Sequence, residues 1–130
     1  DWNSHAIEHE LSGMYDVAHG AGLAVIMPAW MDFVMHHNVM KFAQMAVRVF
    51  GCEMNFERPE LTAKEGIRAF RSFLHSIGLP VNLKELGANE EDIPALVKNQ
   101  GLGKGKTGGF VNLSSADITE IYHIAAKAES

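Results

Sequence analysis

One uninterrupted apolar stretch, from Ala21 to Met31, limits the folds that this chain can adopt. It lies between His19-Gly20 and Asp32, and it is well short of the ~20 residues that a membrane-spanning helix needs. A helix that is apolar on every face must be enclosed by other parts of a globular domain. The sequence therefore predicts a buried core helix from His19 to Met35, around which the remaining segments pack.

Composition supports a globular domain. The chain has 130 residues, of which 47% are hydrophobic and 21% charged. That length fits one domain, and that apolar fraction excludes a disordered chain. There are 11 Lys and Arg against 16 Asp and Glu, and the basic residues are scattered along the sequence. A nucleic-acid partner is therefore excluded, and the short apolar stretch argues against a membrane.

The single cysteine and the first residues of the chain bear on the cellular compartment in which we expect the protein. Cys52 alone excludes an intrachain disulfide framework and a cysteine-rich zinc module, and it is interpreted as a small core residue. The opening Asp1-Trp2-Asn3-Ser4-His5 has neither the basic nor the apolar region of a signal peptide, and no initiating Met. We expect a cytoplasmic protein whose chain begins inside a longer coding sequence or has been processed.

Helix start and stop signals recur along the chain and predict an all-α fold. Asn38 can cap a helix that runs to Phe50 and ends at Gly51. A capping box at 62–65 predicts the start of an amphipathic helix that stops at Gly78. Only 110–113 is extended in character, and 101–109 is a glycine-rich loop. Further helices are predicted from His5 to Gly13, over 83–86 and 93–98, and over 116–127 with Ser114 or Ser115 as the cap.

Histidines at the beginning of the chain carry the main chemical signal. On a helix, His5 and His9 lie one turn apart on the same face, and the break at Gly13 lets the chain fold back so that His19 approaches them. Neutral imidazoles suit Zn²⁺, Fe²⁺, Cu²⁺ and Ni²⁺, so the three residues form a candidate metal site. The alternative is that all three are structural.

The other histidines are interpreted as structural. His36 and His37 are adjacent and would point to different faces of a helix, which predicts one surface residue and one packed residue. His75 and His123 are given the same structural interpretation.

Two short motifs match other functions and are set aside. His5-Ala-Ile-Glu8-His9 fits the H-x-x-E-H pattern of zinc proteases, but that pattern needs a third ligand and a substantial α+β domain. The segment from Gly101 to Thr107 ends like a phosphate-binding loop, yet Gln100 stands where the first glycine is required and no apolar strand precedes it.

The arrangement His5-x₃-His9-x₉-His19-Gly20, followed by the apolar stretch, resembles the iron-containing alcohol dehydrogenase family, closest to its butanol dehydrogenase-like branch. The resemblance covers essentially the whole chain, through 60–67 and 73–80 to 117–122 in the closing helix. It implies a C-terminal all-helical domain in a protein that also has an N-terminal nucleotide-binding domain. The family interconverts alcohols and aldehydes or ketones with NAD or NADP.

The same resemblance implies roles for individual residues. The family holds a divalent metal, iron or sometimes zinc, with one Asp and three His, and His5 and His19 match two of these ligands. His9 matches a histidine close to substrate and nicotinamide, where it could relay a proton. Trp30, Phe33 and Met35 would suit an apolar wall for a short aliphatic substrate, or would simply be core.

The sequence departs from the family in what it lacks. The other Asp and His ligands and the glycine-rich pyrophosphate motif lie upstream in the family, so residues 1–130 are interpreted as a C-terminal fragment that is inactive by itself. Apolar surface left uncovered would favour self-association, and with it a homo-oligomer. The competing hypothesis is a stand-alone helical binding module with structural histidines.

Overall fold

The computed structural model describes residues 19–99 and 114–129, and within these ranges it is helical without strands. The all-α prediction is therefore confirmed. The predicted helix ending at Gly13, the glycine-rich loop and the extended segment 110–113 lie outside the described residues. The elements are α2 (His19–Val34), the 3₁₀ turn η1 (Met35–His37), α3 (Val39–Phe50), α4 (Pro59–Ser76), α5 (Leu83–Leu86), the 3₁₀ turn η2 (Glu90–Asp92), α6 (Ile93–Asn99) and α7 (Ser115–Lys127).

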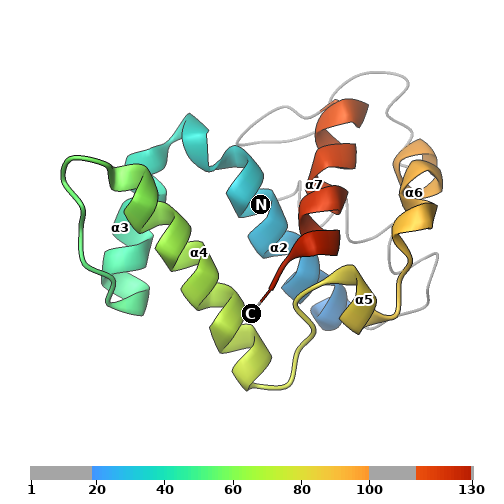
Figure 1. Ribbon diagram of the computed structural model, residues 1–130, viewed down its shortest axis with the longest axis horizontal. Coiled ribbons are helices and arrows are strands. Elements are labelled where there is room, and N and C mark those ends of the chain that lie inside the picture. Colours follow the sequence, from blue (N-terminus) through green and yellow to red (C-terminus); the bar gives the residue numbers. More distant parts are fainter. Residues whose placement is uncertain (1–18, 100–113, 130) are drawn as a thin grey trace.

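Helix α2 is the centre of the fold (Figure 1). It packs against α7, α4 and α5, with α3 and α4 on one side of it and α6 and α7 on the other. Val25, Ile26, Ala29 and Val34 are fully buried, as expected for an apolar helix enclosed by its neighbours. Within the described ranges, no helix is both long and apolar enough to span a bilayer.

The ends of α3 follow from its sequence. The side chain of Asn38 accepts a hydrogen bond from the backbone N–H of Lys41 at 3.2 Å, which satisfies one of the unpaired donors of the first turn. Gly51 ends the helix with a φ of 69°, a left-handed conformation that glycine adopts without strain. Both predictions for this helix are confirmed.

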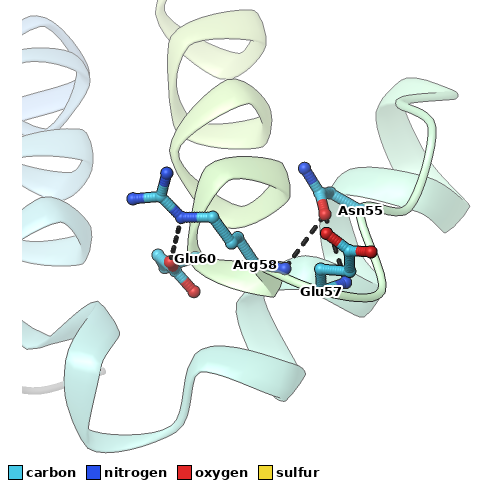
Figure 2. Close-up of polar contacts among 4 residues, drawn as sticks. All are labelled: Asn55, Glu57, Arg58 and Glu60. Atoms are coloured by element: carbon cyan, nitrogen blue, oxygen red, sulfur yellow. Dashed lines mark hydrogen bonds and ion pairs between the residues drawn. The ribbon is translucent and has the colours of Figure 1, made fainter.

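Helix α4 begins earlier than the sequence predicted. The side-chain oxygen of Asn55 accepts hydrogen bonds from the backbone N–H groups of Glu57 (3.2 Å) and Arg58 (2.9 Å), and this turn leads directly into Pro59 (Figure 2). Proline suits a first helical position because its fixed φ is already helical and it has no N–H to leave unpaired. The predicted start at the 62–65 capping box was therefore wrong.

Thr62 has a different role from the one predicted. It lies inside α4, where it is buried, and its hydroxyl accepts from the backbone N–H of Asn55 at 2.8 Å and donates to the carbonyl of Glu53 at 3.2 Å. Thr62 thus holds the α3–α4 connection against α4 instead of capping the helix.

Helix α7 starts with a reciprocal capping box. Ser114 Oγ accepts from the N–H of Asp117 at 3.2 Å, and Asp117 Oδ2 accepts from the N–H of Ser114 at 2.8 Å. The prediction that Ser114 or Ser115 caps this helix is confirmed. Its buried face, which includes Ile121 and Tyr122, packs on α2.

An ion pair joins α4 to α2 inside the molecule. Arg71 Nη1 lies 2.8 Å from Asp32 Oδ2, and only 10% of the Arg71 side chain is exposed. Arg71 Nε and Nη2 are buried without a hydrogen-bond partner in the described part of the chain. Asp32 is therefore the group that compensates a buried guanidinium.

The closest approach of α3 and α4 depends on Gly66. A Cβ at this position would overlap the Cβ of Ala46 across the helix interface. We expect Gly66→Ala to destabilise the protein by about 1–3 kcal/mol in urea denaturation, because overpacking outweighs the gain in helix propensity. Gly20→Ala, a helical glycine with open space around it, is the control and should stabilise by about 0.5 kcal/mol. An equal response of the two variants would contradict the packing argument.

The two ion pairs of α4 should contribute unequally to the free energy of unfolding. Asp32→Ala removes the partner of buried Arg71 and should cost about 2 kcal/mol or more in the same assay. Glu60→Ala breaks an exposed pair, Arg58 Nε to Glu60 Oε1 at 3.3 Å (Figure 2), and should cost less than about 1 kcal/mol. A small loss of stability for Asp32→Ala would contradict this argument, because the interior would then tolerate the charge of Arg71 without its partner.

Candidate functional site

The N-terminus of α2 is the one part of the predicted metal site that lies in the described structure. His19 is the first residue of that helix, so its backbone is fixed at the head of the central core element. The side chain of His19 and all of His5 and His9 lie outside what the structure describes. Their roles as two metal ligands and a proton relay stay predictions.

The described residues hold no group of three or more His, Cys, Asp or Glu placed to bind a metal ion.

His36 and His37 correct the prediction made for them. Both are exposed, and their rings lie side by side with centroids 4.3 Å apart. The prediction of one packed residue was wrong because α2 ends at Val34. The pair therefore occupies the corner η1, and not a helix with a buried face. Two imidazoles are also too few for a closed four-coordinate site.

The two later histidines lie on α4 and α7. His75 is exposed near the end of α4. His123 Nδ1 lies 3.1 Å from Glu90 Oε2, a contact that joins α7 to η2. Neither lies near the head of α2 in sequence. Neither belongs to a group of three or more potential metal ligands among the described residues.

Cys52 is half-buried beside the end of α3, so it is not the core residue that the sequence predicted. Its place after the left-handed Gly51 puts it in the connection that leads away from the helix interface. Burial raises the pKa of its thiol above the usual value, and the negative charge of Glu65 adds to this rise. A thiol with a raised pKa forms less thiolate at neutral pH, which does not suit a nucleophile.

The residues considered for a substrate wall belong to the core. Trp30 and Met35 are buried in the central cluster, and Phe33 is partly buried against it. This agrees with the alternative that these side chains are packing residues. Any contact with substrate from this helix would have to come from the side of α2 that the described elements leave less covered.

Sequence reasoning missed a groove on the outer side of α3. Its volume is about 570 Å³, and it is open to solvent. We call it the α3 groove and define it by its lining residues: Trp30, Lys41, Phe42, Gln44, Met45, Arg48 and Val49. The apolar positions at 42, 45 and 49 were visible in the sequence, but nothing there indicated which of them a neighbouring helix would cover.

A second hollow, of about 600 Å³, lies where α2, α4 and the end of α7 meet. Its lining includes Asp32 and Glu129 as well as Arg68, Arg71 and Lys127. Charges of both signs line it, so it does not select a ligand of one charge. Asp32 and Arg71 already compensate each other there.

Comparison with known proteins places the whole chain in one family. Residues 1–126 match the model of the Fe-containing alcohol dehydrogenase family, C-terminal. The chain is 32% identical over 123 residues to NADH-dependent butanol dehydrogenase A of Clostridium acetobutylicum, covering 93% of this chain and 31% of that enzyme. It is 33% identical over 130 residues to butanol dehydrogenase B of the same organism, covering 98% of this chain and 33% of that enzyme.

Solved structures agree with the sequence comparison. The crystal structure of NADH-dependent butanol dehydrogenase A from Thermotoga maritima matches with a TM-score of 0.89 and 40% identity, over 98% of this chain and 33% of that one. The aldehyde reductase YqhD of Escherichia coli matches with a TM-score of 0.87 and 28% identity, over 96% of this chain and 33% of that one. The chain thus spans about a third of the length of these relatives. It belongs to the Fe-containing alcohol dehydrogenase family and corresponds to the C-terminal, all-helical part of its members.

Proposed function

We propose that residues 1–130 are the C-terminal, metal-binding domain of a longer NAD(P)-dependent dehydrogenase that interconverts primary alcohols and aldehydes. The observation that carries this proposal is the match of residues 1–126 to the C-terminal family model. The similarity to butanol dehydrogenases on one side and to an aldehyde reductase on the other supports this class of substrate. The cofactor-binding part would precede Asp1, and a cytoplasmic location is part of the same proposal.

His5 and His19 are the proposed metal ligands in this chain. Imidazole nitrogens suit both Fe²⁺ and Zn²⁺, so the donor chemistry fits either ion. His19 stands at the head of α2, whose following turns are anchored in the core by residues such as Val25 and Ile26. A rigid helix is a suitable support for a ligand because it fixes the backbone from which the imidazole projects. The remaining Asp and His ligands would come from residues upstream of this chain.

His9 is the proposed proton relay. A bound divalent cation supplies Lewis acidity, which lowers the pKa of the alcohol and polarises the aldehyde carbonyl. The imidazole of His9 could accept the hydroxyl proton and pass it on, because histidine is the side chain that ordinarily changes charge near neutral pH. A bound nicotinamide would supply the hydride chemistry, as acceptor for the alcohol or donor for the aldehyde.

The metal ligands can be tested in the full-length dehydrogenase. We expect His5→Ala and His19→Ala each to lower the bound iron or zinc, measured by elemental analysis after dialysis, by at least about tenfold, because each removes a nitrogen that would bind the metal. His75→Ala, which removes an exposed histidine, is the matched control and should keep its metal. Unchanged metal content in both ligand variants would contradict the assignment.

The isolated 130-residue chain provides a further test of the same proposal. It should show no alcohol oxidation when supplied with NAD or NADP and metal, whereas the full-length protein should turn over. Turnover by the isolated chain would contradict its assignment as an incomplete part. Full-length protein with no metal dependence and no turnover would favour the stand-alone helical binding module.

The relay role separates His9 from the ligands. We expect His9→Ala to retain bound metal but to lower kcat by about 10²-fold or more, since general acid–base catalysis contributes about 10²–10⁴-fold. The loss should be smaller at high pH, where hydroxide replaces the relay. Loss of metal together with activity would instead make His9 a ligand.

A further inference from the structure

The connection between α3 and α4 presents an aromatic side chain to solvent from a well-held turn. Phe56 is 88% exposed, the largest fraction among the exposed large hydrophobic residues of the described chain. Before it, the hydroxyl of Thr62 binds the backbone of residues 53 and 55. After it, the side chain of Asn55 accepts hydrogen bonds from the backbone of residues 57 and 58 (Figure 2). The backbone that carries Phe56 therefore has little freedom to lose when a partner binds.

A hollow of about 660 Å³ lies where this turn meets the first turns of α4, and it is open to solvent. We call it the Phe56 hollow. Its apolar lining comes from Met54, Phe56 and Leu61. Met54 packs against the core cluster, whereas Leu61 is 41% exposed. The hollow thus joins the edge of the core to apolar side chains that are in water, which is typical of a contact surface.

The charged residues that line the Phe56 hollow are all acidic. They are Glu53, Glu57 and Glu65, and each of them is exposed. None of the three forms an ion pair within the described part of the chain. Carboxylates placed around an apolar surface attract a partner with basic side chains and repel one that is acidic. The hollow therefore combines an apolar anchor with a negative charge that selects the partner.

Charge and position indicate which molecule occupies the hollow. Two copies of this chain each carry a net charge of −5, and this charge opposes their association. Figure 1 shows the α3–α4 connection along the outer edge of that helix pair, whereas the head of α2 lies on the other side of the molecule, beside α5. The upstream residues that would complete a metal site on His19 are therefore expected at the far side, away from Phe56.

We propose that the Phe56 hollow is a docking surface for a basic, amphipathic segment of a different protein. Apolar side chains of this segment enter the hollow beside Phe56 and Leu61, and its lysine or arginine side chains face the three carboxylates. An amphipathic segment that lays its apolar side into a hollow is a common mode of protein recognition. This inference goes beyond the proposed dehydrogenase function and does not depend on it.

The first experiment asks whether the hollow is open in the full-length protein. Phe56→Cys, made in a Cys52→Ser background, is treated with a maleimide in native buffer and in urea, and peptide mass spectrometry reads the site by itself. We expect the native rate to lie within about threefold of the rate in urea, because no local opening is needed to reach this position. A native rate that is tenfold slower or more overturns the proposal, because another part of the same protein or a second copy then covers the hollow.

The second experiment measures binding of two defined probes to the full-length protein by fluorescence anisotropy. One labelled peptide carries leucine and lysine at helical spacing, and the other has glutamate in place of each lysine. We expect the lysine peptide to bind at least about tenfold more tightly, and its affinity to fall as salt is added. Absence of binding, or equal affinity for the two peptides, overturns the proposal.

Matched variants locate the binding. Phe56→Ser should weaken the lysine peptide by about tenfold or more, since a central aromatic anchor carries much of the affinity, and Glu57→Lys should weaken it several-fold. The controls are Phe73→Ser, an exposed phenylalanine of α4 outside the hollow, and Glu91→Lys, an exposed glutamate in η2. Both controls should bind like the parent protein. Equal losses in variants and controls overturn the proposal, because the peptide is then bound elsewhere.

Sedimentation velocity separates a different protein from a second copy. Phe56→Ser should keep the mass of the parent protein, and a smaller assembly would overturn the proposal because the hollow would then join two copies of this chain. Alcohol oxidation is measured in parallel and should be unchanged by Phe56→Ser. Binding of the lysine peptide by a protein without turnover would leave this inference in place while contradicting the proposed dehydrogenase function.

Discussion

The need to enclose α2 determines the arrangement of everything else in this chain. Its residues are apolar over nearly its whole length, so each uncovered side exposes hydrophobic surface to water. Two later helices, α4 and α7, pack directly against it, and the short α5 adds a further contact. These partners are far from α2 in sequence, yet they lie against it in the fold (Figure 1).

Helix α4 is held in place by both a close approach and a charge pair. Gly66 lets its backbone come close to Ala46 of α3, and Arg71 reaches Asp32 of α2. The two contacts lie about one and a half turns apart along the helix, so they fix α4 against two different neighbours. Asp32 is the charge that ends the apolar stretch of α2, and its contact with buried Arg71 gives a physical reason for a carboxylate at that position. Neither contact requires a ligand, which makes this half of the domain a scaffold.

How much of the fold could be predicted depends on how far apart in the sequence the interacting residues lie. The caps of α3 and α7 are local, since Asn38 and Ser114 each act on residues a few positions away, and these boundaries were predicted correctly. The start of α4 was missed because an asparagine turn followed by proline competes with the capping box three residues later. The exposure of His36 and His37 depends on where α2 stops. The Arg71–Asp32 pair joins residues far apart in sequence, and periodicity does not show which partners meet.

The same distinction between residues near to each other and far apart in the sequence applies to the candidate site. The type and spacing of the residues indicate His5, His9 and His19 as one candidate metal site, because these three lie within a short stretch of chain. In the proposed enzyme, the other metal ligands and the cofactor-binding part come from residues upstream of this chain. What the structure adds is the support. His19 begins α2, whose later turns lie in the buried core, so the core anchors the helix that carries this residue. A ligand placed at the head of such a helix keeps its position whether or not the rest of the shell is present.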